Sequence, residues 1–381
     1  MRIAVPTETF ANETRVAATP ETVKKYVVAG CEVVIQKGAG DASNIPDEMY
    51  VEAGATLADS FSESCQGAAL VLKVRAPSKD ETDMLQKSSA VAALFSPFTN
   101  PLLQTYNVAG LTCFAMEMIP RISRAQSMDV LSSQANVAGY KAVLLALEHY
   151  GSFMPMLMTA AGTVQPAKVL VMGAGVAGLQ AIATARRLGA MVEAFDVRPA
   201  AKEQVESLGA KFVEVPSEED AEDAGGYAKE MSEEYKQKQA ELIHQHAVAA
   251  DIIITTALIP GRPAPVLITK EAVGAMKPGS VIVDMAVEMG GNCPLSEMDS
   301  VWQKDGVTLI GISNIPALMA ADSSSLYARN LFNFIDLMLD SEKEGLNVDM
   351  DDEIIEASLL CWDGEAMKPQ VFGGDAAGGE A

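Results

Sequence analysis

Residues 168–196 read KVLVMGAGVAGLQAIATARRLGAMVEAFD, and this stretch decides the fold. The apolar run over 169–172 predicts a buried parallel strand, and the glycine-rich turn after it leads into a helix expected to begin near Val176. A second strand is expected over residues 191–195, and Asp196 follows it directly. Strand, glycine turn, helix, strand and terminal acid, in this order, predict a βαβ unit that binds a dinucleotide.

The three glycines of the turn, Gly173-x-Gly175-x-x-Gly178, have different physical tasks. Gly173 permits a tight turn, Gly175 lets backbone approach a pyrophosphate, and Gly178 lets the helix lie close to the strand. The first turn of the helix, at Val176 and Ala177, offers N–H groups without helical partners. These groups suit phosphate oxygens.

Asp196 predicts which dinucleotide is bound. It lies about 20 residues past the glycines, where a carboxylate can accept hydrogen bonds from both hydroxyls of the adenosine ribose. A fixed carboxylate would also repel a 2′-phosphate, which favours NAD(H) over NADP(H). Arg198 is the one neighbour that could serve a 2′-phosphate, although a solvated surface arginine is the simpler interpretation.

Composition limits the class of protein. With 381 residues, 49% of them hydrophobic, the chain is long enough for two domains. The formal charge of −23 disfavours nucleic acid and anionic lipid as direct partners. Five scattered cysteines without a CxxC pair predict neither a metal site nor a disulfide framework. No leader peptide and no apolar run of membrane-spanning length is recognised, so we expect a cytoplasmic chain.

Alternating strand-like and helical runs predict an α/β fold with two Rossmann-like, doubly wound domains. The NAD-binding domain is expected to be inserted into a discontinuous first domain, because helical patterns at 137–149 and 324–339 connect the two. The expected bounds are 1–136 plus 320–365 for the first domain, 137–319 for the NAD-binding domain and 366–381 for a flexible tail. We expect a ligand cleft between the domains and a mobile surface loop over 217–240.

Several further segments carry a family resemblance. They are ETRVAATP at 13–20, PRISRAQSMDVLSSQANVAGYKAV at 120–143, AGGYAKEM at 224–231, TTALIPGRPAPVLIT at 255–269 and VDMAVEMGGNCPL at 283–295. With the glycine turn, they make the chain similar to the NAD(H)-binding component of proton-translocating nicotinamide nucleotide transhydrogenase, and more distantly to alanine dehydrogenase. The segment RISRAQSMDVLSSQ is the one that distinguishes the transhydrogenase branch.

The resemblance implies an activity and partners. It implies a homodimer that binds NADH and passes hydride to NADP⁺ held by a separate NADP(H)-binding component. It also implies a membrane component that couples the exchange to proton translocation. The chain would then be cytoplasmic and peripheral to the inner membrane through its partner subunits.

The resemblance also implies roles for individual residues. The polar set around the nicotinamide is Arg121, Gln126, Asp129 and Ser132, with Gln126 nearest the point of hydride transfer. Tyr227 is implied to lie on a mobile loop that closes over the nucleotide. Further cofactor contacts are implied at Val197, Ala257 and Leu258. Ser132 has an alternative structural interpretation, because it precedes a predicted helix and would suit a cap.

An alanine dehydrogenase-like activity is the main alternative. Arg15 and Lys73 match the positions that hold the substrate carboxylate in those enzymes. Oxidation of an amino acid also needs a proton acceptor, however, and the three histidines of the chain (His149, His244, His246) are not placed for this task. Where alanine dehydrogenases have a histidine, residues 97–99 are Pro, Phe and Thr. A nucleotide-binding regulator without catalysis is disfavoured by the retained polar set.

Overall fold

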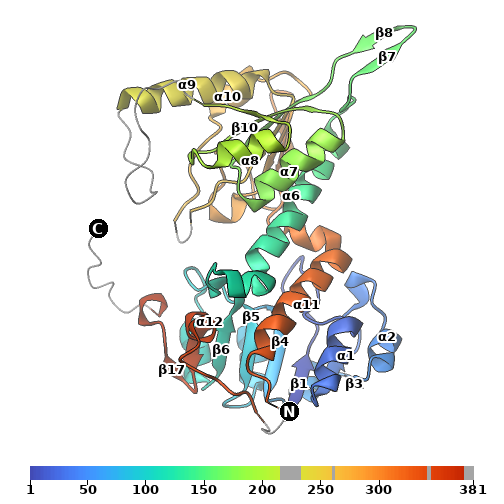
Figure 1. Ribbon diagram of the computed structural model, residues 1–381, viewed down its shortest axis with the longest axis vertical. Helices are drawn as coiled ribbons and strands as arrows, with labels where there is room; N and C mark the ends of the chain where they lie inside the picture. The colour runs from blue at the N-terminus through green and yellow to red at the C-terminus, as the bar shows by residue number, and fades with distance from the viewer. Residues whose placement is uncertain (215–232, 260–261, 341–344, 373–381) are drawn as a thin grey trace. The chain divides into compact units, whose positions relative to one another are not determined.

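The computed structural model describes residues 1–214, 233–259, 262–340 and 345–372 (Figure 1). The chain divides into two compact units. The first unit comprises Met1–Gln134 and Pro316–Ala381, and the second comprises Ala135–Ile315. Each unit is built around one large sheet, so each is described separately.

The sheet of the first unit has eight strands in the order β17-β16-β6-β5-β4-β1-β2-β3. Six of them are parallel and run in the order β3-β2-β1-β4-β5-β6, which is a doubly wound arrangement. The antiparallel strands β16 and β17 complete one edge. The bounds are β1 Arg2–Val5, β2 Glu32–Gln36, β3 Thr56–Ala58, β4 Leu70–Arg75, β5 Ala90–Leu94, β6 Thr112–Ala115, β16 Leu359–Trp362 and β17 Glu365–Ala366.

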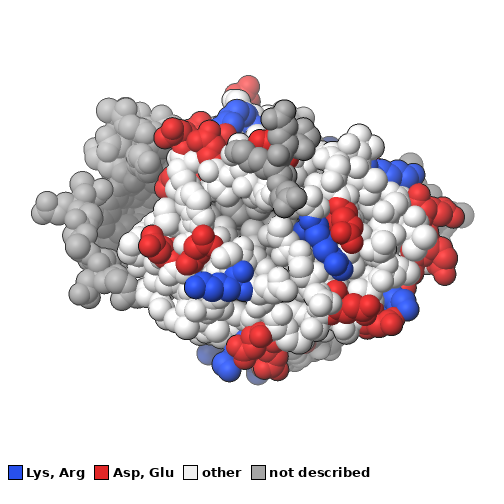
Figure 2. Space-filling view, turned by 90° about the horizontal axis from the view of Figure 1, so that it is seen from below, with Lys and Arg blue, Asp and Glu red and all other residues white. Residues whose placement is uncertain are grey.

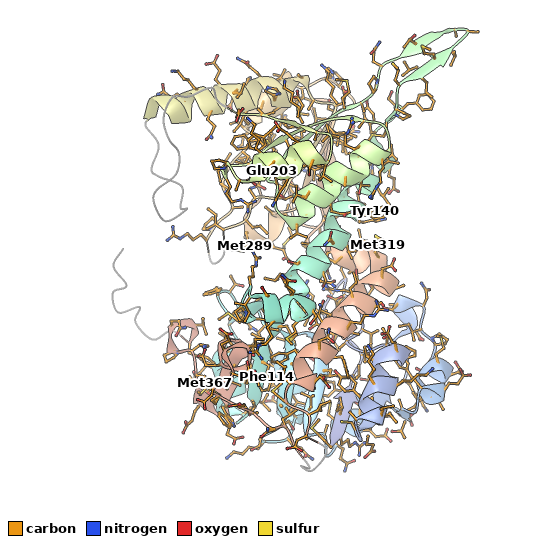
Figure 3. The ribbon with its side chains drawn as sticks, in the orientation of Figure 1. Phe114, Tyr140, Glu203, Met289, Met319 and Met367 are labelled. Carbon is orange, nitrogen blue, oxygen red and sulfur yellow. The ribbon has the colours of Figure 1, made fainter. Side chains whose placement is uncertain are left out.

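Helices cover both faces of this sheet. Because strand side chains alternate, Leu70 and Leu72 of β4 join one core cluster and Val71 joins the other. Phe334 meets Phe114 of β6 edge to face at 5.6 Å, which packs α11 on the sheet. Phe114 is labelled in Figure 3. The helices are α1 Pro20–Val28, α2 Asp47–Glu52, α3 Phe61–Cys65, α4 Lys79–Met84, α5 Leu103–Val108, α11 Ala320–Asp336 and α12 Glu353–Ser358, with short helices η1 Asp41–Ser43, η2 Met116–Met118, η3 Ser123–Met128, η5 Ile315–Met319 and η6 Pro369–Val371.

The sheet of the second unit has seven strands in the order β11-β10-β9-β12-β13-β15-β14. All are parallel except the edge strand β14, so the sheet is again doubly wound, and its strand order reverses beside β9. The strands are β9 Lys168–Met172, β10 Met191–Phe195, β11 Lys211–Phe212, β12 Ile252–Thr255, β13 Val281–Asp284, β14 Ser300–Lys304 and β15 Val307–Gly311. The helices are α7 Val176–Arg187, α8 Ala201–Ser207, α9 Glu233–Ala249, α10 Lys270–Ala275 and η4 Val287–Met289.

The predicted fold class is confirmed, and the structure adds elements that the sequence did not indicate. Helix α6, Val130–His149, begins seven residues before the predicted start at 137. A short hairpin of β7 Leu157–Thr159 and β8 Gly162–Val164 extends away from the rest of the second unit (Figure 1). Residues 366–372, expected to belong to a flexible tail, fold onto the first unit: the N–H of Met367 donates to Leu360, and Phe372 packs on the core.

Four further observations concern membrane-spanning helices, metal sites, the cysteines and the surface charge. Over the ranges that the structure describes, no helix is long and apolar enough to cross a membrane. In the same ranges, no group of three or more histidine, cysteine, aspartate or glutamate residues is placed to hold a metal ion. All five cysteines are buried, and none is joined in a disulfide. On the face shown in Figure 2, basic and acidic side chains form small mixed groups separated by uncharged surface.

Candidate functional site

The glycine turn after β9 is packed so closely that side chains are excluded at two of its three glycines. A Cβ on Gly178 would lie 1.8 Å from the carbonyl oxygen of Gly173. Gly173 itself has φ +103, and a Cβ there would lie 2.5 Å from Oγ1 of Thr256. A Cβ on Gly175, in contrast, would meet no atom of the described residues within 4 Å. The turn is therefore closed toward the protein and open at Gly175, on the side where a ligand would approach.

The open side of the turn lies at the start of α7. Gly175 is the N-cap residue, no side chain among the described residues caps the helix, and the first helical residues are Val176 and Ala177. The first N–H groups of an α-helix have no helical partners and carry partial positive charge. On the β12 side, Thr256 Oγ1 donates to the carbonyl oxygens of Met172 and Gly173 at 3.3 and 3.1 Å, which fixes the turn. The result is a rigid site suited to a phosphate group.

Asp196 stands beside this turn at the end of β10. Its Oδ2 accepts the backbone N–H of Ala174 at 2.7 Å, and its Oδ1 accepts that of Arg198 at 2.8 Å. The Arg198 guanidinium also donates to both oxygens at 3.0 Å. Burial raises the pKa of Asp196, but the hydrogen bonds from Arg198 and Ala174 outweigh it, so the net pKa is lowered. The carboxylate is thus charged, and its side chain is only 6% exposed, against 60% for that of Arg198.

Two apolar side chains are exposed at the same end of the sheet. Val197 follows β10 and is 64% exposed, and Leu258 follows β12 and is 53% exposed. Because β10 and β12 are the two neighbours of β9, these side chains lie on either side of the glycine turn. Exposed apolar residues that flank a phosphate site suit a flat, weakly polar ring.

A buried asparagine that the sequence alone did not indicate positions the loop after β12. Asn292 is fully buried; its Oδ1 accepts the N–H of Ala257 at 3.2 Å, and its Nδ2 donates to the carbonyl oxygens of Ala257 and Pro265 at 2.9 and 2.8 Å. Ala257 is therefore held through its backbone. The available signal was the Gly-Gly-Asn sequence at 290–292, shortly after a predicted buried strand.

The first unit contains a separate pocket of about 340 Å³. The short helix η3 forms one side of it. In a 3₁₀ helix residues three apart lie on the same side, and Ala125 and Met128 both point into the core. Gln126 is thereby turned outward. The pocket is lined by Pro120, Arg121, Ile122, Ser123, Ala125, Gln126, Asp129 and Ser132.

The four residues of the predicted polar set all line this pocket, but they form two pairs of different character. Among the described residues, neither the guanidinium of Arg121 nor the amide of Gln126 has a hydrogen-bond partner. Asp129 and Ser132 are bound to each other: the N–H and the hydroxyl of Ser132 donate to the Asp129 carboxylate at 2.8 and 2.6 Å. Arg121 and Gln126 are thus the groups available to a ligand.

Asp129 also explains the early start of α6. Its side chain accepts the N–H three residues ahead, and its carbonyl accepts the N–H of Ser133 at 3.2 Å, which is the geometry of an N-cap. The alternative interpretation of Ser132 as the cap residue is wrong. Ser132 lies in the first turn of the helix, and its hydroxyl reinforces the cap.

Asn330 of α11 holds this region together, and the sequence did not indicate it. Its Nδ2 donates to the carbonyl oxygen of Ser127 at 2.8 Å, and its Oδ1 accepts the hydroxyl of Ser133 at 2.6 Å. It thereby connects η3 to the first turn of α6. An asparagine within an apolar helix pattern was the available signal, because a buried amide requires polar partners.

Replacing Asn330 with alanine should lower the free energy of unfolding by about 1–3 kcal/mol, because buried partners lose their hydrogen bonds. Asn333 offers a matched control, since its Nδ2 donates to the same Ser127 oxygen at 3.1 Å but makes no contact with Ser133. Asn333→Ala should be close to wild type in urea unfolding. Equal losses in the two variants would contradict a special role for Asn330.

Arg15 and Lys73, the candidate carboxylate-binding cations, are buried and already paired. Arg15 is 3% exposed and bonds Glu13 at 2.7 Å and the Gln134 amide oxygen at 2.8 Å. Burial raises the pKa of Glu13, yet hydrogen bonds and charges from Arg15 and Arg75 outweigh it and lower the pKa to about 2. The Glu13 carboxylate is therefore charged throughout the neutral range and remains bound to Arg15.

The second cation is held in the same way. Lys73 is 1% exposed, and its Nζ lies 3.1 Å from Glu81 and 3.4 Å from Glu8. Burial lowers the pKa of Lys73, but the two carboxylates outweigh it and raise the pKa. Carboxylates of the chain itself thus occupy both cations that an amino-acid substrate would need.

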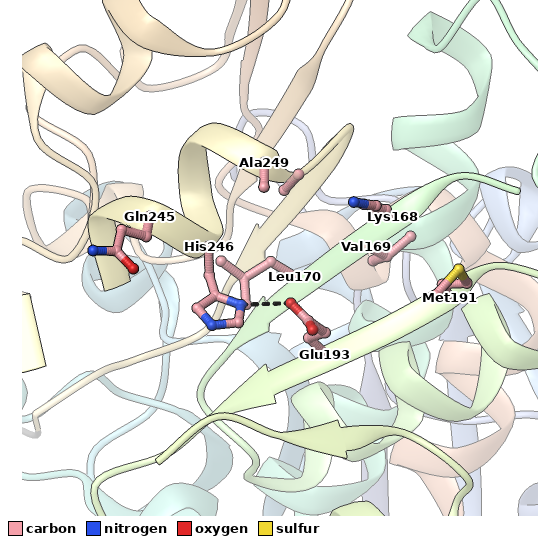
Figure 4. A pocket seen from close by; sticks show the side chains of 9 residues that line it. Lys168, Val169, Leu170, Met191, Glu193, Gln245, His246 and Ala249 are labelled. Atoms are coloured by element: carbon pink, nitrogen blue, oxygen red, sulfur yellow. Dashed lines mark hydrogen bonds and ion pairs between the residues drawn. The ribbon is translucent and has the colours of Figure 1, made fainter. Parts of the chain in front are cut away.

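A second pocket, of about 260 Å³, lies in the second unit at the amino ends of β9 and β10 (Figure 4). Residues from these strands line it together with Gln245, His246 and Ala249 of α9. His246 Nδ1 bonds Glu193 Oε2 at 2.5 Å. Dinucleotides bind at the carboxyl ends of parallel strands, so this pocket is not part of the candidate site.

Tyr227 and most of the predicted mobile loop, 217–232, lie outside the described residues. From Glu233 onward the charged pattern forms α9. The structure thus gives two groups of candidate residues. One group surrounds the glycine turn of the second unit, and the other lines the pocket of the first.

Comparisons with known proteins identify the family. Residues 4–138 match the alanine dehydrogenase/PNT N-terminal domain, and residues 142–369 match the alanine dehydrogenase/PNT C-terminal domain. An NAD(P) transhydrogenase subunit alpha polypeptide of Rhodospirillum rubrum is 50% identical, over 98% of this chain and 99% of that protein. The crystal structure of a transhydrogenase from Sinorhizobium meliloti is 49% identical, with a TM-score of 0.87 over 96% of this chain and all of that one.

Alanine dehydrogenases are similar at a greater distance. The enzyme of Methanococcus maripaludis is 30% identical over 85% of this chain and 83% of its own length. The chain therefore belongs to the alanine dehydrogenase/PNT family, within which it groups with the transhydrogenase alpha subunits rather than with the alanine dehydrogenases.

Proposed function

We propose that the chain binds NAD(H) and transfers hydride between NADH and NADP⁺ held by a partner component, as the NAD(H)-binding component of a proton-translocating transhydrogenase. One observation favours this reaction over the oxidation of an amino acid: Arg15 and Lys73 are each paired with carboxylates of the chain itself. With both cations occupied by Glu13, Glu8 and Glu81, neither is open to the carboxylate of an amino acid. Exchange between two nicotinamides needs no such cation.

The second unit would hold the dinucleotide at the carboxyl ends of β9, β10 and β12. The first turn of α7 suits the pyrophosphate, and Gly175 leaves room for its approach. The Asp196 carboxylate would accept hydrogen bonds from the ribose hydroxyls, a role that also disfavours a 2′-phosphate. Val197 and Leu258 would cover the adenine, while Asn292 holds the backbone of Ala257 beside it.

The pocket of the first unit would act by positioning. When bound, the nicotinamide supplies the hydride donor or acceptor at C4, and the protein needs to contribute no proton to this step. A glutamine amide can both donate and accept hydrogen bonds, so Gln126 would orient the nicotinamide riboside. Arg121 would bind neighbouring polar groups. The Asp129–Ser132 pair would keep the start of α6 rigid beside them.

The proposal includes a second copy of the chain and two further components. The β7–β8 hairpin and the segment before it expose Phe153, Met156 and Met158, at 56%, 56% and 78%. A protruding hairpin with exposed apolar side chains supports a homodimer in which a second copy covers them. The NADP(H)-binding component would meet the hydride-transfer pocket. A membrane component would couple the exchange to proton translocation and hold this cytoplasmic chain at the inner membrane.

Shortening Gln126 to asparagine should slow hydride transfer by about ten- to a hundredfold, because the amide is withdrawn by one methylene while the rest of the site stays in place. The dissociation constant of NADH should change by less than about twofold, since orientation acts in the transition state. Single-turnover transfer to an NADP⁺ analogue and NADH titration measure the two quantities. Ser127 is next to Gln126 but does not line the pocket, so Ser127→Ala should leave the transfer rate and the NADH dissociation constant unchanged. Equal losses in rate and affinity for Gln126→Asn would contradict the orienting role.

One assay separates the proposed activity from its alternatives. The chain is mixed with NADH and either pyruvate plus ammonia or an NADP⁺-binding transhydrogenase component with an NADP⁺ analogue. Oxidation of NADH only in the second mixture supports the proposal. Turnover with pyruvate would mean an amino-acid dehydrogenase. NADH binding with neither reaction would mean a nucleotide-binding regulator.

A further inference from the structure

Glu117 has an unusual environment in the first unit. It lies on η2 directly after β6, four residues before Arg121 at the pocket. Its Oε1 accepts the backbone N–H of Ser96, the second residue after β5, which adopts a left-handed conformation with φ +50. Its Oε2 is buried and has no hydrogen-bond partner among the described residues. Glu117 thus joins the loops that follow two neighbouring strands, and one of these loops leads into the pocket.

The unpartnered oxygen decides which protonation state fits this environment. A buried carboxylate whose charge is not compensated is far less favourable than the neutral acid. Burial accordingly raises the pKa of Glu117 to about 7, against the lowering effect of backbone hydrogen bonds and of the Arg75 charge. Arg75, from β4, is itself held by Glu13 at 3.1 Å. From α11 the Tyr327 phenol interacts electrostatically with Glu117, and its own pKa is raised by burial and by nearby carboxyls.

A comparison with Glu8 shows what is missing around Glu117. Glu8 is also buried with a raised pKa, but both of its oxygens have partners. Its Oε1 accepts the N–H of Val74 at 2.6 Å, and its Oε2 lies 3.4 Å from the Lys73 ammonium. Glu8 can therefore be ionised where it stands. Glu117 would need to move toward solvent or toward Arg75 to carry a charge.

We propose that Glu117 is a positioning residue whose proton controls the conformation of the segment from 118 to 132, and through it the rate of hydride transfer in the pocket. With the proton bound, the carboxyl keeps its contact with Ser96 and the pocket has the geometry described. When the proton leaves to solvent, the carboxylate is driven out of its burial. The chain that carries Arg121 and Gln126 then shifts.

The expected effect on hydride transfer rests on the proposed function, whereas the expected change in the segment from 118 to 132 does not. One variant tests both effects. Glu117→Gln keeps an oxygen that accepts the Ser96 N–H and cannot ionise. Glu63→Gln is the control, because Glu63 is an exposed glutamate at the start of α3 in the same unit. Single-turnover hydride transfer to an NADP⁺ analogue on the partner component is measured from about pH 5.5 to 9, with the NADH dissociation constant at each pH.

In the wild type the transfer rate should fall by up to about tenfold for each pH unit above the pKa of Glu117, at constant NADH affinity. The Glu117→Gln rate should stay at the wild-type low-pH value across this step, and Glu63→Gln should follow the wild type. The wild type and the two variants are assayed with the same partner component. Groups that titrate on the partner therefore affect all three rates equally and cancel in the comparison. A step of equal size in Glu117→Gln overturns the proposal.

A measurement without the partner separates failure of the inference from failure of the proposed function. Amide hydrogen exchange of the isolated chain is compared between wild type and Glu117→Gln at each pH, which cancels the intrinsic pH dependence of exchange. As the pH rises, the amides of residues 118–132 should become less protected from exchange in the wild type but not in Glu117→Gln. The midpoint of this change should lie near neutral pH. Isotope-edited infrared spectra should show a glutamate carboxyl that titrates in the same range in the wild type and is missing in Glu117→Gln, so that Glu8, whose pKa is also raised, cancels in the comparison. No such group, or identical protection in both chains, overturns the inference even if hydride transfer is observed.

Discussion

Gly178→Ala should destabilise the second unit by at least about 3 kcal/mol and abolish measurable NADH binding. The added Cβ would lie 1.8 Å from the Gly173 oxygen and 2.9 Å from its carbonyl carbon, both of them backbone atoms that cannot move aside as a flexible side chain would. Helix α7 would have to separate from β9, and the first-turn N–H groups would leave their positions. Urea unfolding and an NADH titration measure the two losses.

Two other glycines provide matched controls for this change. At Gly175 a Cβ meets nothing within 4 Å in the part of the chain that the structure describes, and the backbone is extended, so Gly175→Ala should fold normally. It should still weaken NADH binding by about ten- to a hundredfold, because the methyl occupies space needed by the pyrophosphate. Gly274, inside α10, likewise has no described atom within 4 Å of an added Cβ, and Gly274→Ala should add about 0.5–1 kcal/mol of stability without affecting binding. Normal stability of Gly178→Ala would contradict the close approach of α7 to the strand.

Asp196→Asn should weaken NADH binding by about ten- to a hundredfold, because hydrogen bonds to a charged acceptor contribute about 1.5–3 kcal/mol. The asparagine oxygen can still accept the Ala174 N–H, so the turn should keep its shape. NADPH binding should become stronger, since the charge that repels a 2′-phosphate is gone and Arg198 is released from its ion pair. Parallel titrations with both nucleotides measure the change in preference.

Arg198→Ala is the matched control for this prediction. It removes the ion pair and keeps the carboxylate, which still accepts the N–H groups of Ala174 and of residue 198. NADH binding should change little, and NADPH binding should not improve. A gain in NADPH affinity in Arg198→Ala as large as in Asp196→Asn would show that the carboxylate is not the group that discriminates.

The regions of the fold that the sequence predicted well are those determined by local constraints. Strand β9, the glycine turn, α7 and β10 follow from an apolar run, three glycines and a terminal acid within 29 residues. The elements that could not be predicted depend on distant pairing. Strand β14, SVWQK, is mostly polar, and only its antiparallel register with β15 makes it a strand. Strand β16 likewise exists through its pairing with β6, more than 240 residues earlier in the sequence.

The same distinction between local and distant determinants applies to the candidate site. Arg121, Gln126, Asp129 and Ser132 are close in sequence, and the structure has all four around one pocket. Asn330 acts on this region from about 200 residues away, and no local pattern connects it to Ser127 or Ser133. The asparagine within an apolar helix pattern indicates a buried amide, but only the structure identifies the partners of that amide.

The internal ion pairs of the first unit keep free carboxylates away from its buried cations. These pairs join Arg15 to Glu13, and Lys73 to Glu8 and Glu81. Amino acids and keto acids all carry a carboxylate, and an open buried cation would bind that group. Here the chain supplies its own carboxylates in fixed positions, at high effective concentration and without loss of translational freedom. Free metabolites cannot compete with ligands tethered in this way. If the chain has the proposed function, the exchange of reducing equivalents between nucleotide pools would not depend on the concentrations of amino acids and keto acids.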